Sequence, residues 1–187
     1  MSGTRLHPQR ISVEDYLQGE QVGEARHEYL GGDVYAMVGA SDRHNLIIGN
    51  LYSTLRPHVR GTPCQLFMAD MKVRFKVAGE DAFYYPDLML ACDPADRATY
   101  YRTRPCLIVE VLSEATERID RREKLLAYTG IESLQEYILL AQDRMMAEIH
   151  RREDGWRAHV MTEGDVPLHC LGTAVPLAVI YEDINLG

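Results

Sequence analysis

Two carboxylates, Asp87 and Glu110, lie in stretches whose other residues are typical of buried strands. Asp87 stands in YYPDLMLA and Glu110 in CLIVEVLS, at positions where an apolar side chain would pack better. Burying an ionised carboxylate without a partner is costly. If the two strands are neighbours, Mg²⁺ removes this cost for both carboxylates, because it binds their oxygens together with water and phosphate oxygens. The pair therefore predicts a Mg²⁺ site, with Mn²⁺ as a substitute, and chemistry on a phosphate ester.

The same residues leave a structural alternative open. Asp87 follows Pro86 and would then belong to a turn, while Glu110 would cap backbone groups or pair with an arginine such as Arg104. Perturbed carboxylates also occur in purely structural networks. Spacing alone does not separate the two interpretations.

The elements around the pair predict an α/β (α+β) fold with a core of αβββαβ order. The helix in DRHNLIIGNLYSTLRPHV is amphipathic and stops at Pro57. Strands are predicted in CQLFMADMKVRFKV, YYPDLMLAC and CLIVEVLS, then a helix in EATERIDRREKLLAYTG ending at Gly130, then a buried strand in EYILLAQ. This order indicates a mixed central sheet flanked by helices.

Extra elements are predicted at both ends of this core. ISVEDYLQGE is a short helix that Ser12 caps, and RHEYLGGDVYAM forms a β-hairpin around Gly-Gly-Asp. After the core, MAEIHRRE and GWRAHVMT form a second hairpin that turns at Asp-Gly. We expect one domain over residues 1–187, with its core at about 42–142.

Composition limits the compartment and the partners. The four cysteines, Cys64, Cys92, Cys106 and Cys170, form no CxxC pair, and we expect neither disulfides nor a zinc site. No apolar run approaches the ~20 residues that span a bilayer, and the start lacks the apolar segment of a signal peptide. These features predict a cytoplasmic protein without a membrane partner.

A formal net charge of −8 opposes non-specific binding to a polyanion, so a nucleic acid must be held by a local basic patch. The best patch mixes cations with tyrosine rings in the loop between the two carboxylate strands and continues on the next helix. The expected contact residues are Arg97, Arg102, Arg104 and Arg121. A solvated, ion-paired surface is the alternative for each of them.

Pro-Asp, then Glu-Val-Leu in a second strand, then DRREKLLAYTGIESLQEYILL together resemble the Uma-type family of restriction endonucleases. This family is a branch of the PD-(D/E)XK phosphodiesterase superfamily, with a restriction endonuclease-like fold. RHEYLGGDVYAM and the following His44 match the family's N-terminal pattern. The resemblance implies an αβββαβ core, one or two Mg²⁺ ions at Asp87 and Glu110, and hydrolysis of nucleic-acid phosphodiester bonds, with DNA favoured.

The superfamily pattern has a lysine two residues after the glutamate, where this chain has Leu112. The resemblance implies that Lys124, on the next helix, takes its place, orienting the attacking water and offsetting charge on the phosphate. Helical periodicity alone predicts a different environment, because an apolar stripe lies nearly opposite Lys124. The stripe consists of Ala115, Ile119 and Leu126. On this basis Lys124 would form an exposed ion pair with Asp120.

The resemblance also implies accessory residues. Glu28 in RHEYL would be a further metal ligand, and His44 in DRHNL would transfer a proton or contact phosphate. Tyr128 would face the cleft beside Lys124. A hairpin charge and a histidine near a helix start are the structural alternatives for Glu28 and His44. Asp70 in FMADMKVRF either joins the cluster or marks a bulge or turn.

Other functions stay open. A catalytically inactive nuclease-like module that binds nucleic acid or protein is favoured by the net charge and by Leu112. A hydrolase of another phosphate ester is the third candidate, since two carboxylates and a metal do not specify a polynucleotide. We also expect a homodimer, because such folds often pair across apolar edges or extra hairpins.

Overall fold

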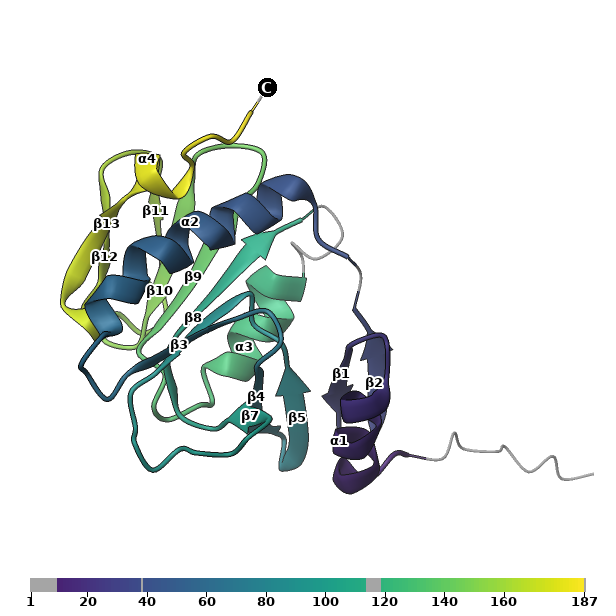
Figure 1. Cartoon of the computed structure of the whole chain (residues 1–187). Helices are drawn as coiled ribbons and strands as arrows, with labels where there is room; N and C mark the ends of the chain where they lie inside the picture. Colours follow the sequence, from purple (N-terminus) through teal and green to yellow (C-terminus); the bar gives the residue numbers. More distant parts are fainter. Residues whose placement is uncertain (1–9, 38, 114–118, 187) are drawn as a thin grey trace, which may run out of the picture.

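The computed structural model describes residues 10–37, 39–113 and 119–186 (Figure 1). The described strands form a six-stranded sheet, a five-stranded sheet and a two-stranded sheet. Helices pack on the six-stranded sheet, so the fold is the expected α+β arrangement of mixed sheet and helices. Among these residues, no helix is both long enough and apolar enough to cross a membrane.

The six-stranded sheet has the order β11-β10-β9-β8-β6-β3. Its strands are β3 (Gln65–Met68), β6 (Leu88–Ala91), β8 (Pro105–Leu112), β9 (Glu136–Ala141), β10 (Ala147–Arg151) and β11 (Ala158–Met161). β8 and β9 run parallel and the other pairs antiparallel. The central strands are continuous apolar runs because both faces of the sheet are covered.

Helix α2 (Asp42–Val59) covers one face through buried residues such as Ile47, Leu51 and Leu55. The C-terminal elements extend this layer: β12 (Asp165–Leu168), η2 (His169–Leu171), β13 (Thr173–Pro176) and α4 (Leu177–Ile180). The helix continues through Pro57, so the predicted stop there is two residues early. The Pro57 carbonyl instead accepts a hydrogen bond from the backbone N–H of Arg60 at 3.4 Å, which closes the last turn.

The opposite face meets a second helix and the five-stranded sheet, whose order is β2-β1-β5-β4-β7. Its strands are β1 (His27–Leu30), β2 (Asp33–Ala36), β4 (Lys72–Val77), β5 (Glu80–Tyr84) and β7 (Tyr101–Arg102). The described part of the helix consists of a π-helical segment, η1 (Ile119–Lys124), followed by α3 (Leu125–Tyr128). Residues 114–118, where the predicted helix begins, lie outside the described residues. Gly130 follows the cap residue Thr129, as expected.

Local signals place the N-terminal elements correctly. Ser12 caps α1 (Val13–Val22) by accepting the N–H of Asp15 at 3.1 Å. β1 and β2 form the predicted hairpin, and Gly31 and Gly32 take the positive φ values, 56° and 101°, that its turn requires. In Figure 1, α1, β1 and β2 lie together beside β5, with which β1 pairs.

The expectation that no disulfide forms is wrong. Cys64, just before β3, and Cys92, just after β6, are joined by a disulfide. The two strands pair antiparallel, with Gln65 opposite Ala91, so the next residues outward face each other. Sequence spacing does not show this pairing, because 28 residues separate the two cysteines.

Candidate active site

The structure places Asp87 and Glu110 side by side. Leu88 pairs with Val109 across the antiparallel strands β6 and β8, so Asp87, one residue before β6, lies next to Glu110. The backbone N–H of Val111 donates to Asp87 Oδ2 at 2.7 Å. Asp87 is partly exposed, whereas Glu110 is buried. The alternative in which Glu110 pairs with Arg104 does not occur.

Glu110 faces the helix because side chains alternate along a strand. Ile108 and Leu112, two residues to either side, belong to the core between the sheet and α3. Glu110 Oε1 accepts hydrogen bonds from Lys124 Nζ at 3.1 Å and from the Tyr128 hydroxyl at 3.0 Å. Lys124 and Tyr128, one helical turn apart, thus donate to the same oxygen of the buried Glu110.

Lys124 is buried among carboxylates rather than exposed. Its Nζ lies 3.1 Å from Glu110, 3.2 Å from Asp120 and 3.4 Å from Glu28. The pair with Asp120 exists, but Asp120 is only 2% exposed and Lys124 8%, so the predicted surface pair is wrong. Leu126, predicted to face the core, is 75% exposed. The π-helical segment η1 explains the difference, because its wider turns shift side chains away from the α-helical period.

His44 approaches Asp87 from the first turn of α2. Its Nε2 lies 3.0 Å from Asp87 Oδ1. Ser41 fixes the start of this helix, since its Oγ accepts the backbone N–H of His44 at 3.1 Å and donates to Gln142 Oε1 at 2.7 Å. The helix cap therefore positions the histidine against the carboxylate.

We expect Ser41→Ala to lower the free energy of unfolding by about 1 kcal/mol, because the substitution removes the helix cap. Urea unfolding measures this change. Ser53→Ala is the matched control, since Ser53 lies inside the same helix and donates only to the Asn50 carbonyl. Equal losses for the two variants would contradict a stabilising role of the cap.

The site carries an excess of negative charge. Burial raises the pKa of the Glu110 carboxyl well above its usual value, Asp87, Asp120 and Glu28 raise it further, and Lys124 opposes the rise. Burial alone would lower the pKa of the Lys124 ammonium, but the surrounding carboxylates outweigh burial and raise it. Within the described residues, the carboxylates of this cluster outnumber its ammonium.

This cluster fits a divalent cation. Asp120 Oδ1 is buried and makes no hydrogen bond in the described part of the chain, although Lys124 lies near it. An oxygen of this kind, together with excess carboxylates, is what Mg²⁺ binds in proteins. No three Asp, Glu, His or Cys side chains among the described residues are arranged to enclose an ion. Asp87 and Glu110 would therefore hold it together with water and substrate oxygens.

Some members of the site were not predicted. Asp120 was assigned only to a surface pair, and Tyr84 and Tyr137 were not singled out. The Lys124 ammonium lies 5.8 Å from the centroid of the Tyr84 ring, and the Tyr137 hydroxyl donates to the Asp120 carbonyl at 3.1 Å. An aspartate four residues before a lysine was the one available signal, and it also fits an exposed pair.

Three of the four predicted nucleic-acid contacts lie away from this site. The loop that carries Arg97, Arg102 and Arg104 leads into Pro105, at the other end of β8 and about 16 Å along the strand from Glu110. The side chain of Arg97 donates to the Pro94 carbonyl, and Arg104 pairs with Asp93 at 2.6 Å.

The other two arginines also have partners within the protein. Arg102 is buried, donates to Gln65 at 2.9 Å and lies over the Phe67 ring. Arg121 forms an ion pair with Glu148. Each of the four arginines therefore has a partner within the protein.

Asp70 does not join the cluster. It lies in the bend between β3 and β4, where Ala69 has φ 57°, and it pairs with Arg26 at 3.3 Å. A turn residue was the second interpretation of its position. The predicted strand CQLFMADMKVRFKV is accordingly split in two, because the chain leaves one sheet here and enters the other.

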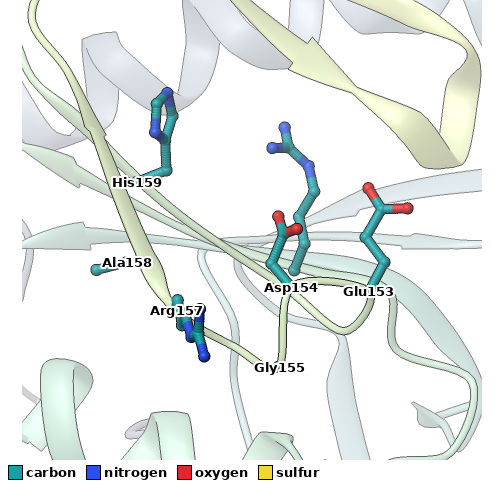
Figure 2. Close-up of a pocket in the computed structure, with 7 residues that line it drawn as sticks. Glu153, Asp154, Gly155, Arg157, Ala158 and His159 are labelled. Atoms are coloured by element: carbon teal, nitrogen blue, oxygen red, sulfur yellow. The ribbon is translucent and has the colours of Figure 1, made fainter.

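A surface hollow lies elsewhere, at the turn between β10 and β11. It has a volume of about 760 Å³ and is open to solvent. Figure 2 shows Glu153 and Asp154 on this turn and His159 farther along β11. Glu153 pairs with His169 at 2.9 Å. None of the clustered carboxylates lines this hollow, so the buried cluster, and not the hollow, is the candidate active site.

The fold places the chain among restriction endonuclease-like proteins. A "putative nuclease belonging to DUF820" from Anabaena variabilis has the same fold, with a TM-score of 0.72 over 91% of this chain and 97% of that one, at 15% identity. The pattern of the Uma2 family, described as "Putative restriction endonuclease", matches residues 13–178. The chain belongs to the Uma2 family, which confirms the resemblance read from the sequence.

Two curated relatives from Synechocystis sp. support this membership. "Uncharacterized protein slr1290" is 34% identical over 94% of this chain and 93% of its own length. "Uncharacterized protein sll1609" is 31% identical over 82% of this chain and 86% of its own length. The similarity therefore extends over nearly the whole chain.

Proposed function

We propose that this protein is a metal-dependent endonuclease that hydrolyses phosphodiester bonds in nucleic acid, with DNA as the favoured substrate. One observation carries the proposal: Lys124, from the helix, contacts the same Glu110 that lies beside Asp87. The three groups that the PD-(D/E)XK pattern combines are thus adjacent in space, although Leu112 occupies the usual lysine position. The family description and the name of the structural neighbour support the same reaction class.

In this proposal Asp87 and Glu110 hold Mg²⁺ or Mn²⁺. When bound, the ion supplies Lewis-acid activation of water and neutralises charge on the phosphate. Lys124 Nζ donates hydrogen bonds to the attacking water and to the phosphate oxygens, where negative charge increases in the transition state. Tyr128 and His44 are positioning residues, because they fix the carboxylates of Glu110 and Asp87 respectively. Glu28 is a further carboxylate within reach of Lys124.

The inactive interaction module remains the second candidate. A net charge of −8 and the internal partners of the predicted contact arginines favour it. Leu112 in place of a lysine no longer favours the inactive module, because the Lys124 ammonium reaches Glu110 from the helix.

The test is cleavage of labelled single-stranded DNA, double-stranded DNA and RNA with Mg²⁺ or Mn²⁺ and with a chelator. We expect cleavage only with a divalent ion, and only background cleavage by Asp87→Ala. The control is Asp93→Ala, which removes an aspartate paired with Arg104 beyond the other end of β6. Circular dichroism checks that both variants fold. Cleavage by Asp87→Ala at the wild-type rate would refute the assignment.

A further inference from the structure

The hairpin strand β2 places an exposed aromatic ring beside the candidate site. In the β1–β2 pair Tyr35 lies directly opposite Glu28, so the two side chains project from the same face of the sheet. The Glu28 carboxylate lies 3.4 Å from Lys124 Nζ. Tyr35 is 54% exposed. Tyr35 is therefore the cross-strand neighbour of Glu28, which contacts the buried Lys124.

Electrostatics agree with this placement. Burial is the main cause that raises the pKa of the Tyr84 phenol, and Glu28 and Tyr35 add to the rise. Tyr84 in turn packs edge-on against Tyr128, with ring centroids 5.8 Å apart. Tyr84 and Tyr128 thus form an aromatic pair at the Glu110 carboxylate, to which the Tyr128 hydroxyl donates.

The exposed Tyr35 ring beside the site suits binding of unpaired bases better than binding of the phosphates of a duplex. Binding to duplex phosphates depends on Lys and Arg side chains that displace counterions. Here the net charge is −8, and the four arginines expected to contact nucleic acid already have partners within the protein. Aromatic rings bind single strands instead, because any unpaired base has a free face on which they can stack. Paired bases inside a helix do not offer that face.

We infer that Tyr35 stacks on an unpaired base next to the scissile phosphate, so that the substrate is single-stranded or locally unpaired nucleic acid. This inference rests on the proposed nuclease function and specifies its substrate class. Lys124 and the carboxylates act on the phosphate, while Tyr35 holds the neighbouring base.

The test measures binding of a fluorescent single strand, and of the duplex it forms with its complement, to the full chain in chelator, where no cleavage is expected. Tyr35→Ala should weaken single-strand binding by about 5- to 150-fold. Tyr35→Phe and Tyr35→Trp should bind like the wild type, because they keep a ring. 2-Aminopurine placed in the strand should be quenched by wild type and less by Tyr35→Ala. With Mg²⁺, KM should rise in Tyr35→Ala more than kcat falls.

Val160→Ala is the control, since Val160 is 55% exposed and lies on β11, an edge strand three strands from β8. Equal weakening by both alanine variants, or a loss in Tyr35→Phe equal to that in Tyr35→Ala, would overturn the inference. So would sedimentation showing that Tyr35→Ala converts a dimer to monomers while affinity per chain is unchanged, because Tyr35 would then contact a second copy. Wild-type cleavage with no effect of Tyr35→Ala overturns this inference only. Failure of the wild type both to bind and to cleave overturns the nuclease function as well.

Discussion

Lys124→Met is expected to reduce cleavage by about 100- to 1,000-fold, the loss typical of removing one preorganised donor from a transition state. It should also lower the free energy of unfolding by about 3–5 kcal/mol, because Glu110, Asp120 and Glu28 lose the buried ammonium they share. Single-turnover cleavage and urea unfolding measure the two effects. Mn²⁺ should restore part of the stability but not the rate, because the ion neutralises carboxylates without replacing the donor.

Lys76→Met is the matched control for this variant. Lys76 forms an ion pair with Asp81 at 2.9 Å, but its side chain is 60% exposed. A pair of this kind contributes at most about 1 kcal/mol. Near-wild-type cleavage by Lys124→Met would mean that the lysine is structural only.

Glu110→Gln should abolish cleavage and at the same time stabilise the metal-free protein. The cleavage rate should fall by at least about 1,000-fold, since a ligand of the proposed ion is lost. The free energy of unfolding should rise on the order of 1 kcal/mol, because one negative charge leaves a buried cluster that has too many. Thermal unfolding in chelator measures the stability, and the stabilisation that Mn²⁺ gives the wild type should disappear in the variant.

Glu136→Gln, on the neighbouring strand β9, should instead lower the free energy of unfolding. Glu136 is as buried as Glu110, but it pairs with Arg151 at 3.1 Å and accepts the N–H of Cys170 at 3.0 Å. Its neutralisation leaves Arg151 with an uncompensated charge and should cost about 3–5 kcal/mol. The folded fraction should still cleave. Destabilisation by Glu110→Gln of similar size would contradict the excess of negative charge at the site.

The sequence predicted β8, which carries Glu110, and the two hairpins that flank the core, whereas the predicted strand YYPDLMLAC is divided between β5 and β6 and Asp87 lies just before β6. Both signals are local: β8 is a continuous apolar run, and Gly31 and Gly32 supply the positive φ values of a tight turn. The sequence did not show where the predicted strands are interrupted. At Ala69 and Asp70 the chain passes from one sheet to another, and this depends on tertiary packing rather than on local pattern.

The environment of Lys124 could not be derived from periodicity. A period of 3.6 residues turns it away from the core, whereas the π-helical segment brings it to Glu110. No local residue pattern predicted that segment. The internal partners of Arg102 and Arg121 were equally hidden, because Gln65 and Glu148 are distant in sequence.

Leu112 lies at the strand position where the superfamily pattern has a lysine. An apolar residue can stand there because a helix supplies the ammonium instead. Two residues after Glu110, Leu112 is 5% exposed and packs in the core beside Tyr128. Lys124, 14 residues from Glu110, supplies the charge at the same carboxylate. A search for related enzymes that reads residues along one strand would pass over this chain. A search that compares the positions of charged atoms in space would retrieve it, together with others in which the cation has moved between elements.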